Sequence, residues 1–369
     1  MIQLFPFKIP FKNTFKTSMG NFDFRDGILV CFSYQNQKYY AEISPLPVFS
    51  ISDLDTCVQL FTANKSIIDN FLTGIVNSID GKFDFISVPE IIKKSAVLSK
   101  TWIKKELKSQ LTPEIHFAID HIIFQILINS SNINLETEPN FIIPINTSAK
   151  SLDDGSKARS SGITTVKLKV GMDTAYELSL IKSIRDHHPD LTIRLDANGA
   201  WNLSEAISFI KQVKSFNIEY IEQPLSIQEL LLFGHELRSY GISIAADESA
   251  RSYLDVVALI ENKSADILIL KPPMLGSFVN LLNINDLASH SNLPCVFTST
   301  LDSAINRRFA AVLCSAFGSK KYAHGFGTGS LFEYDITLKE DHIENGNLIV
   351  PLSGISDSDI NTNIVGSHI

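Results

Sequence analysis

Three acidic residues each close an apolar run of this chain. Asp196 ends LTIRLD, Glu222 ends EYIE and Asp247 ends ISIAAD. They are separated by about 25 residues each, roughly the length of one strand, one helix and two short loops. Because the parallel strands of a barrel deliver their last residues to one mouth, we expect these carboxylates to meet at a shared site.

Three lysines occupy matching positions in neighbouring runs. Lys167 and Lys169 close TTVKLKV, which precedes the first acid, and Lys271 closes ILILK, which follows the last. Residues two apart in a strand share a face, so both lysines of the pair must face the barrel interior if the alternate valines and leucine pack on helices. Buried charges are avoided unless they are compensated. We therefore expect these amines to face the acids.

Such a combination of acids and amines predicts metal-assisted proton abstraction. No His or Cys stands at the corresponding strand ends, and an all-carboxylate set suits Mg²⁺, or Mn²⁺, better than Zn²⁺. A metal on a substrate carboxylate would stabilise the enediolate formed when the neighbouring carbon loses its proton. A lysine would be the base, and we expect a like-charged neighbour, the metal and partial burial to lower its pKa.

Taken one at a time, these residues indicate little. A single acid at a strand end is more often a surface or capping residue, and most Lys-x-Lys pairs are solvated. The order of all six along successive runs favours function. A binding or scaffold barrel would have no reason to bury these charges. An aldolase with a Schiff-base lysine would need no three-acid cluster.

The elements that would carry these residues recur from about residue 140 onward. Short apolar runs alternate there with amphipathic segments whose apolar residues repeat at three- and four-residue spacing. The eight runs are FIIPIN, TTVKLKV, LTIRLDAN, EYIEQP, ISIAADES, DILILKP, PCVFTST and YAHGFGT. This pattern predicts an α/β fold with a (β/α)8-type parallel barrel over residues 140–328, in preference to an open doubly wound sheet.

The rest of the chain predicts a second, mixed unit. Within residues 1–135, ILVCFSY and KYYAEIS read as a hairpin, and Thr112 with Pro113 begins a helix that runs to Ile128. This indicates an α+β N-terminal capping domain. Residues 329–369 contain the strand-like pieces EYDITL and NLIVPL, and we expect this C-terminal segment to return toward the cap and complete it.

Composition excludes several classes of protein. The chain has 369 residues and a formal net charge of −8, which argues against nucleic-acid binding. No apolar run approaches the length that spans a bilayer, and the start lacks a signal-peptide core. The four cysteines are scattered and predict reduced thiols. We expect a cytoplasmic protein without membrane insertion, with a small anionic carboxylate as substrate; the sequence does not indicate an oligomeric state.

With these residues in view, the chain resembles the enolase superfamily, and within it the muconate lactonizing enzyme subgroup, over nearly its whole length. The motifs that carry the resemblance are TTVKLKVG, IRLDANGAW, YIEQPL, IAADES, DILILKPPMLGS and FTSTLDSAIN. Nearer the ends, FKTSMGNFDFRDGILVCF and AHGFGTGSLF are similar to the o-succinylbenzoate synthase family. That family implies a lyase of menaquinone biosynthesis. It dehydrates 2-succinyl-6-hydroxy-2,4-cyclohexadiene-1-carboxylate (SHCHC) to o-succinylbenzoate.

The resemblance also implies roles for the lysines. Lys169 matches the base that removes the proton alpha to the substrate carboxylate and then assists departure of the hydroxyl on the same face. Lys271 matches the lysine that stabilises the enediolate from the opposite side, in part by a cation–π contact. Lys167 matches the auxiliary lysine beside the base. Enolase-type sites pair such a base with Mg²⁺.

For the remaining site residues, the resemblance implies metal ligands and substrate contacts. Asp196, Glu222 and Asp247 match the metal ligands, with Asn198 and Glu248 around them. Ser299 and Thr300, at the seventh strand end, match substrate contacts. The loop around Ser18 matches a cap loop that closes over the site.

Related reactions share this lysine pattern. N-acylamino acid racemases use the same three lysines for 1,1-proton transfer, and a muconate cycloisomerase is a further alternative. Dipeptide epimerases usually carry an Asp-x-Asp at the eighth strand to hold the substrate amino group, which HGFGTG lacks. The catalytic residues therefore leave dehydration and racemisation open, while the end motifs favour dehydration.

Overall fold

The computed structural model covers most of the chain. The residues it describes are 1–17, 20–78, 87–106, 111–128, 134–137, 141–143, 156, 158–351 and 355–369. Among them, no helix has both the length and the apolar character needed to cross a membrane.

The N-terminal part pairs an antiparallel sheet with helices. Its strands are β1 (Ile2–Thr17), β2 (Gly20–Tyr34) and β3 (Gln37–Ile43), and its helices are α1 (Leu54–Ser78), α2 (Val88–Glu106) and α3 (Pro113–Leu127). Tyr34 pairs with Gln37 across a two-residue turn, which confirms the expected hairpin. Gln35 takes a positive φ of 51° there, so the turn forms without the Asn-Gly signal. Thr112 is the N-cap of α3, also as predicted.

Parallel strands form the second sheet. Within the described residues it has seven strands in consecutive order: β5 (Phe141–Ile143), β6 (Thr165–Lys169), β7 (Thr192–Asp196), β8 (Ile218–Glu222), β9 (Ser243–Ala246), β10 (Ile267–Leu270) and β11 (Cys295–Phe297). An isolated parallel bridge between Thr298 and Gly325 adds an eighth position. The short helix η2 (Gly327–Leu331) follows and contacts β5. The (β/α)8-type architecture is thus confirmed, with the glycine-rich eighth run reduced to a bridge and a turn.

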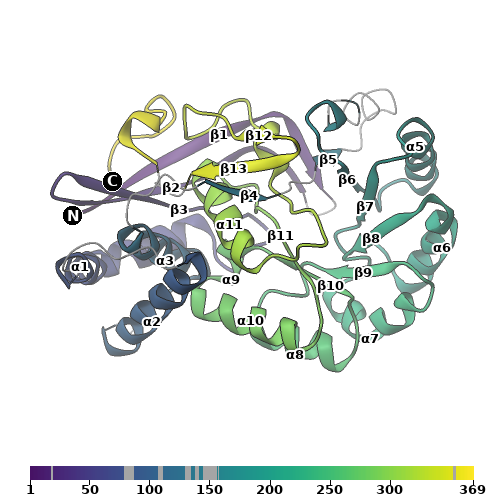
Figure 1. The fold of residues 1–369 in the computed structure, drawn as a ribbon, viewed down its shortest axis with the longest axis horizontal. Coiled ribbons are helices and arrows are strands. Elements are labelled where there is room, and N and C mark those ends of the chain that lie inside the picture. The colour runs from purple at the N-terminus through teal and green to yellow at the C-terminus, as the bar shows by residue number, and fades with distance from the viewer. Residues whose placement is uncertain are drawn as a thin grey trace.

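Helices cover the outside of this sheet (Figure 1). They are α5 (Thr174–His187), α6 (Leu203–Val213), η1 (Lys214–Phe216), α7 (Ile227–Arg238), α8 (Tyr253–Glu261), α10 (Phe278–His290) and α11 (Ala304–Phe317). The short helix α9 (Pro272–Leu275) contacts α3 of the N-terminal part. Val166 and Leu168 of β6 are buried in the core between sheet and helices, which leaves Lys167 and Lys169 to face the interior. Alternation along one strand therefore separates core residues from site residues.

The last residues lie against the first strand. The strand β12 (His342–Glu344) pairs with β13 (Asn347–Pro351), which in turn pairs with β4 (Asn134–Thr137), and η3 (Asp357–Asp359) follows. Val365 bridges to Phe7, and Gly366 N donates to Pro6 O at 2.7 Å. The two termini accordingly lie side by side (Figure 1). The division of the chain at residues 135, 140 and 328 stays a prediction.

One buried acid joins the cap helices to the barrel. Asp120 of α3 accepts a hydrogen bond from the backbone N of Phe278, the first residue of α10, at 2.7 Å. It therefore satisfies a free N–H at a helix N-terminus from outside that helix. Burial raises the pKa of Asp120 to about 7.

Asp120→Asn should change how stability depends on pH. Because the folded-state pKa is raised, native protein binds more protons than unfolded protein between about pH 4 and 7, so Asp120 weakens the fold as pH rises through that window. The difference in unfolding free energy between Asp120→Asn and wild type should grow in favour of the variant from pH 4 to pH 8, by up to about 4 kcal/mol. Urea unfolding across this range measures it. If the unfolding free energies of the two proteins changed with pH in parallel, the raised pKa of Asp120 would be contradicted.

Candidate active site

The structure brings the three acids together at the carboxyl ends of adjacent strands. Asp196 is the last residue of β7, Glu222 is the last of β8, and Asp247 directly follows β9. Asp196 and Glu222 are partners in the strand register. All three are buried, with exposed fractions of 1%, 1% and 5%. Carboxylates so placed need cations close by.

Two lysines of β6 meet these acids. Lys167 Nζ lies 3.0 Å from Glu222 Oε1 and 3.2 Å from Asp196 Oδ2. Lys169 Nζ donates to Asp196 Oδ2 at 2.6 Å and to Asn198 Oδ1 at 2.5 Å. Asp196 is thus shared between two ammonium groups, and Lys167 bridges two acids.

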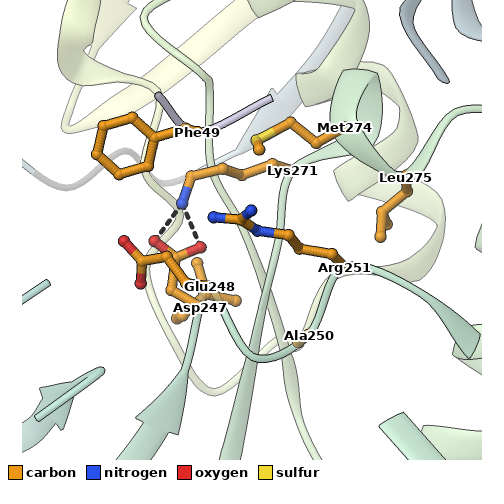
Figure 2. Close-up of a pocket in the computed structure, with 9 residues that line it drawn as sticks. Phe49, Asp247, Glu248, Ala250, Arg251, Lys271, Met274 and Leu275 are labelled. Atoms are coloured by element: carbon orange, nitrogen blue, oxygen red, sulfur yellow. Dashed lines mark hydrogen bonds and ion pairs between the residues drawn. The ribbon is translucent and has the colours of Figure 1, made fainter. Parts of the chain in front are cut away.

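The third lysine approaches from the other side of the mouth. Lys271 directly follows β10 and donates to both carboxylate oxygens of Asp247 (Figure 2). Asn198, with a positive φ of 46°, links the two sides because its Nδ2 donates to Glu248 Oε1 at 3.0 Å. Lys169 and Lys271 are therefore separated by strands β7, β8 and β9, with the acids between them.

The pKa values of the acids reflect burial and this crowding. Burial alone would raise the pKa of Asp196, but Lys169 and Lys167 hold it below its ordinary value. Burial, together with the negative charge of Asp196, raises the pKa of Glu222 to about 8 despite Lys167. Burial and the Asp247 charge also raise the pKa of Glu248.

The pKa values of Lys167 and Lys271 are raised in this charge arrangement, and the expected lowering of the pKa of the base stays a prediction. Burial does oppose their charged forms. Glu222 and Asp196 nevertheless raise the pKa of Lys167 well above its ordinary value, and Asp247 does the same for Lys271. Acids in direct contact with an amine stabilise its charged form.

The three acids have the chemistry of a site for a hard cation, although in this structure the lysines neutralise their negative charge. As the side chains stand, no group of three or more His, Cys, Asp or Glu among the described residues is arranged as a metal site. The donor set is nevertheless all oxygen. Within the same part of the chain, Glu248 Oε2 is buried without a hydrogen-bond partner. Together, these oxygens fit Mg²⁺ once the ammonium groups move aside.

Above the charges lies a pocket. The acids, the lysines and Asn198 line its base, and four apolar side chains of the N-terminal part line its wall: Phe15, Phe22, Leu46 and Phe49. The resemblance implied a cap loop around Ser18 over the site, but sequence reasoning named none of these four residues, because their spacing carries no signal for the pocket.

Two of the three residues predicted to contact the substrate lie at the pocket. Ser299 and Thr300 both line the pocket. Ser299 Oγ is hydrogen-bonded to Thr328 Oγ1 at 2.6 Å, and Thr300 N donates to Asp302 Oδ2 at 2.8 Å. Ser18 lies outside the described residues.

A smaller pocket beside Lys271 contains a residue that sequence reasoning also missed. Arg251 lines it together with Glu248, Met274 and Phe49 (Figure 2). Among the described residues, Arg251 Nε is one of the buried polar atoms without a hydrogen-bond partner. Arg251 follows the IAADES motif by two residues, which is the only signal the sequence carries for it.

The barrel part matches a known family. Residues 152–355 match the family described as enolase C-terminal domain-like. This match covers more than half of the chain and includes all six charged strand-end residues. The chain belongs to this family.

Curated relatives of two activities match part of the chain. An o-succinylbenzoate synthase of Thermobifida fusca is 31% identical over 201 residues, which is 53% of this chain and 62% of that protein. An L-Ala-D/L-amino acid epimerase of Populus trichocarpa is 32% identical over 203 residues, 53% of this chain and 48% of that protein. The matched regions thus span about half to three fifths of the relatives' length.

Solved structures of the same superfamily share the fold over the whole chain. A muconate lactonizing enzyme from Mycobacterium smegmatis, complexed with muconolactone, has a TM-score of 0.79 at 17% identity and covers 98% of this chain and 96% of its own. A dipeptide epimerase from Cytophaga hutchinsonii, complexed with Mg and a dipeptide, has a TM-score of 0.75 at 21% identity, covering 100% and 98%. The fold is shared, and these identities support no more than the fold.

Lys167→Met should destabilise the protein strongly in the presence of a chelator. It leaves Asp196 and Glu222 buried with less compensation, and breaking a buried pair costs about 3–5 kcal/mol. The matched control is Lys182→Met, which removes an exposed pair with Asp186 and should cost under about 1 kcal/mol. Urea unfolding measures both. Equal losses of unfolding free energy in the two variants would show that Lys167 stabilises the protein no more than an exposed lysine does.

Proposed function

We propose that this protein is an o-succinylbenzoate synthase, a lyase that dehydrates SHCHC to o-succinylbenzoate in menaquinone biosynthesis. The observation that carries the proposal is the placement of Lys169 and Lys271 on opposite sides of three buried acids, beneath an apolar wall. A substrate carboxylate would lie over the acids with its alpha carbon between two amines. That arrangement suits removal of an alpha proton.

The pocket wall favours a carbocyclic substrate over a dipeptide. Phe15, Phe22, Leu46 and Phe49 offer apolar surface for a ring. A dipeptide brings an ammonium group that needs a carboxylate. The acids that line the pocket are already paired with lysines, and the eighth-strand side contributes Gly325 and Thr328 instead. The motifs near both ends of the chain support the same choice.

In the proposed mechanism, Lys169 in its neutral form takes the proton from the carbon alpha to the ring carboxylate. The electron pair left behind passes into the carboxylate as an enediolate, whose charge the Lys271 ammonium faces from the other side. When the pair returns, the hydroxyl leaves from the adjacent ring carbon. Lys169 returns its proton to that hydroxyl, so water is released and the ring becomes aromatic. Lys167 keeps a positive charge beside the base.

Asp196, Glu222 and Asp247 would hold the cation. Bound Mg²⁺, or Mn²⁺, would draw electron density from the substrate carboxylate and so stabilise the added negative charge. Asn198 would orient Lys169, whose ammonium donates to it, and Glu248 would hold Asn198 in place through the hydrogen bond from Asn198 Nδ2. Ser299 and Thr300 would contact the substrate.

A second candidate is racemisation of N-acylamino acids. The same lysines on opposite faces could remove and return an alpha proton, and the epimerase relative supports this chemistry. A muconate-lactonizing-type reaction ranks below it, and a non-catalytic barrel ranks last because the buried charges would then serve nothing.

The test of the proposed function is a spectrophotometric assay of purified protein with SHCHC. We expect conversion to o-succinylbenzoate that requires Mg²⁺ and stops with a chelator. A parallel assay with N-acylamino acids addresses the second candidate. Absence of SHCHC turnover, under conditions where a known synthase works, would reject the proposal.

Lys169→Ala should abolish turnover while the protein remains folded. Lys169 serves proton transfer and not the core, so we expect loss of general-base catalysis by at least about 100-fold. The same assay, with circular dichroism as the check on folding, measures it. The control is Lys211→Ala, an exposed lysine of α6, which should leave turnover unchanged. Full activity of Lys169→Ala would remove Lys169 as the base.

A further inference from the structure

A buried acid of the cap reaches the N-terminus of helix α11. Glu42 of β3 is fully buried and accepts hydrogen bonds from the N-terminus of α11. Its Oε2 accepts from Ser303 Oγ at 2.5 Å and from Asn306 N at 3.2 Å, while Oε1 accepts from Ser303 N at 3.2 Å and Ser44 Oγ at 2.6 Å. Glu42 therefore joins two segments that are about 260 residues apart in the sequence, which only the tertiary fold can do.

The segment just before that helix forms part of the pocket wall. Thr300 and Leu301 line the pocket, and Leu301 takes a φ of 59°, in the left-handed region that a leucine rarely adopts. Thr300 donates from both its backbone N and its hydroxyl to Asp302, which has no exposed surface. Surrounding contacts must hold such a conformation in place, and Ser303 with Glu42 lies immediately beyond it.

A buried arginine holds the backbone segment that leads into the apolar wall of the pocket. Arg25 of β2 donates to the backbone O of Ser44 and, at 2.9 Å, to that of Pro45. These residues lead directly into Leu46, which lines the pocket together with Phe49. Arg25 thus shapes the start of the apolar wall.

The charges of these groups act on one another. Burial raises the pKa of Glu42 to about 6, with Asp302 adding to the effect and Arg25 opposing it. Asp302 and Glu42 in turn oppose the loss of charge that burial imposes on Arg25. The positive charge of Arg25 is therefore balanced by Glu42 of the cap and Asp302 of the barrel part.

We propose that Glu42 is a positioning residue for the substrate pocket: together with Arg25 and Asp302 it holds the cap wall and the β11–α11 corner in register. It touches no reacting atom. It acts through Ser303 on the strained corner at Thr300 and Leu301, so its loss should weaken substrate binding. This role rests on the proposed function only in taking the pocket as the active site.

The structure supplies a matched control. Asp120 and Glu42 are both buried acids of the cap that accept hydrogen bonds from the N-terminus of a barrel helix, α10 and α11 respectively. The residues at the start of α10 do not line the pocket, whereas those just before α11 do. Glu42→Gln and Asp120→Asn make the same change of charge at equal side-chain size, and only one of them lies behind the pocket wall.

The experiment compares these variants in kinetics and in amide hydrogen exchange. For Glu42→Gln we expect KM to rise about tenfold while kcat changes less than about threefold, because binding contacts are lost and the lysines are untouched. Amide hydrogen exchange in peptides covering residues 298–306 should be faster than in wild type. For Asp120→Asn, KM and those peptides should stay as in wild type. If Glu42→Gln does not fold, Ser303→Ala removes a single contact and should show the same effects in weaker form.

The outcomes separate this role from the proposed function. If wild type fails to convert SHCHC, the proposed function fails, and the hydrogen-exchange comparison together with kinetics on N-acylamino acids still tests Glu42. If Glu42→Gln, or Ser303→Ala in its place, lowers stability but leaves both KM and the exchange of residues 298–306 unchanged, Glu42 is merely structural and the inference is overturned.

Discussion

Three carboxylates buried at the ends of β7, β8 and β9 must be matched by positive charge, and most features of this protein's site follow from that requirement. Isolated ions in a protein interior are too poorly solvated to persist. Here Lys167, Lys169 and Lys271 supply the charge, each from a strand that neighbours or flanks the acids. The same oxygens can accept a divalent cation only if the amines give way. In the proposed reaction, that exchange would direct the lysines toward the substrate, one on each side.

The N-terminal part contributes one wall of the site at the mouth of the barrel. Barrel strands deliver charges, but they provide little surface to recognise the rest of a substrate. Leu46 and Phe49 add an apolar wall from the N-terminal part, and Glu42 ties that part to the corner after β11. Chemistry and recognition are thus divided between two regions of the chain. A shift of the cap would alter binding without moving the lysines, because the lysines are held by the acids.

Much of this could be predicted from the sequence, for reasons that are local. Alternation in TTVKLKV and the recurrence of acids at the ends of apolar runs depend on one strand at a time, and they led to the barrel and to the meeting of Asp196 and Glu222. Glu42 and Asp302 were missed because their contact partners are set by tertiary structure alone. The raised pKa of Lys167 could not be predicted, because it depends on which acids come into contact with that amine, which spacing does not reveal.

The central claim is that the strand-end acids form a cation site whose occupation releases the lysines. A crystal structure of the protein grown with Mn²⁺, with its anomalous signal, tests this most directly. The account predicts an Mn²⁺ peak bonded to oxygens of Asp196, Glu222 and Asp247, with Lys169 and Lys271 turned away from those acids to opposite sides. Mn²⁺ bound elsewhere, with the lysine pairs intact, would contradict it.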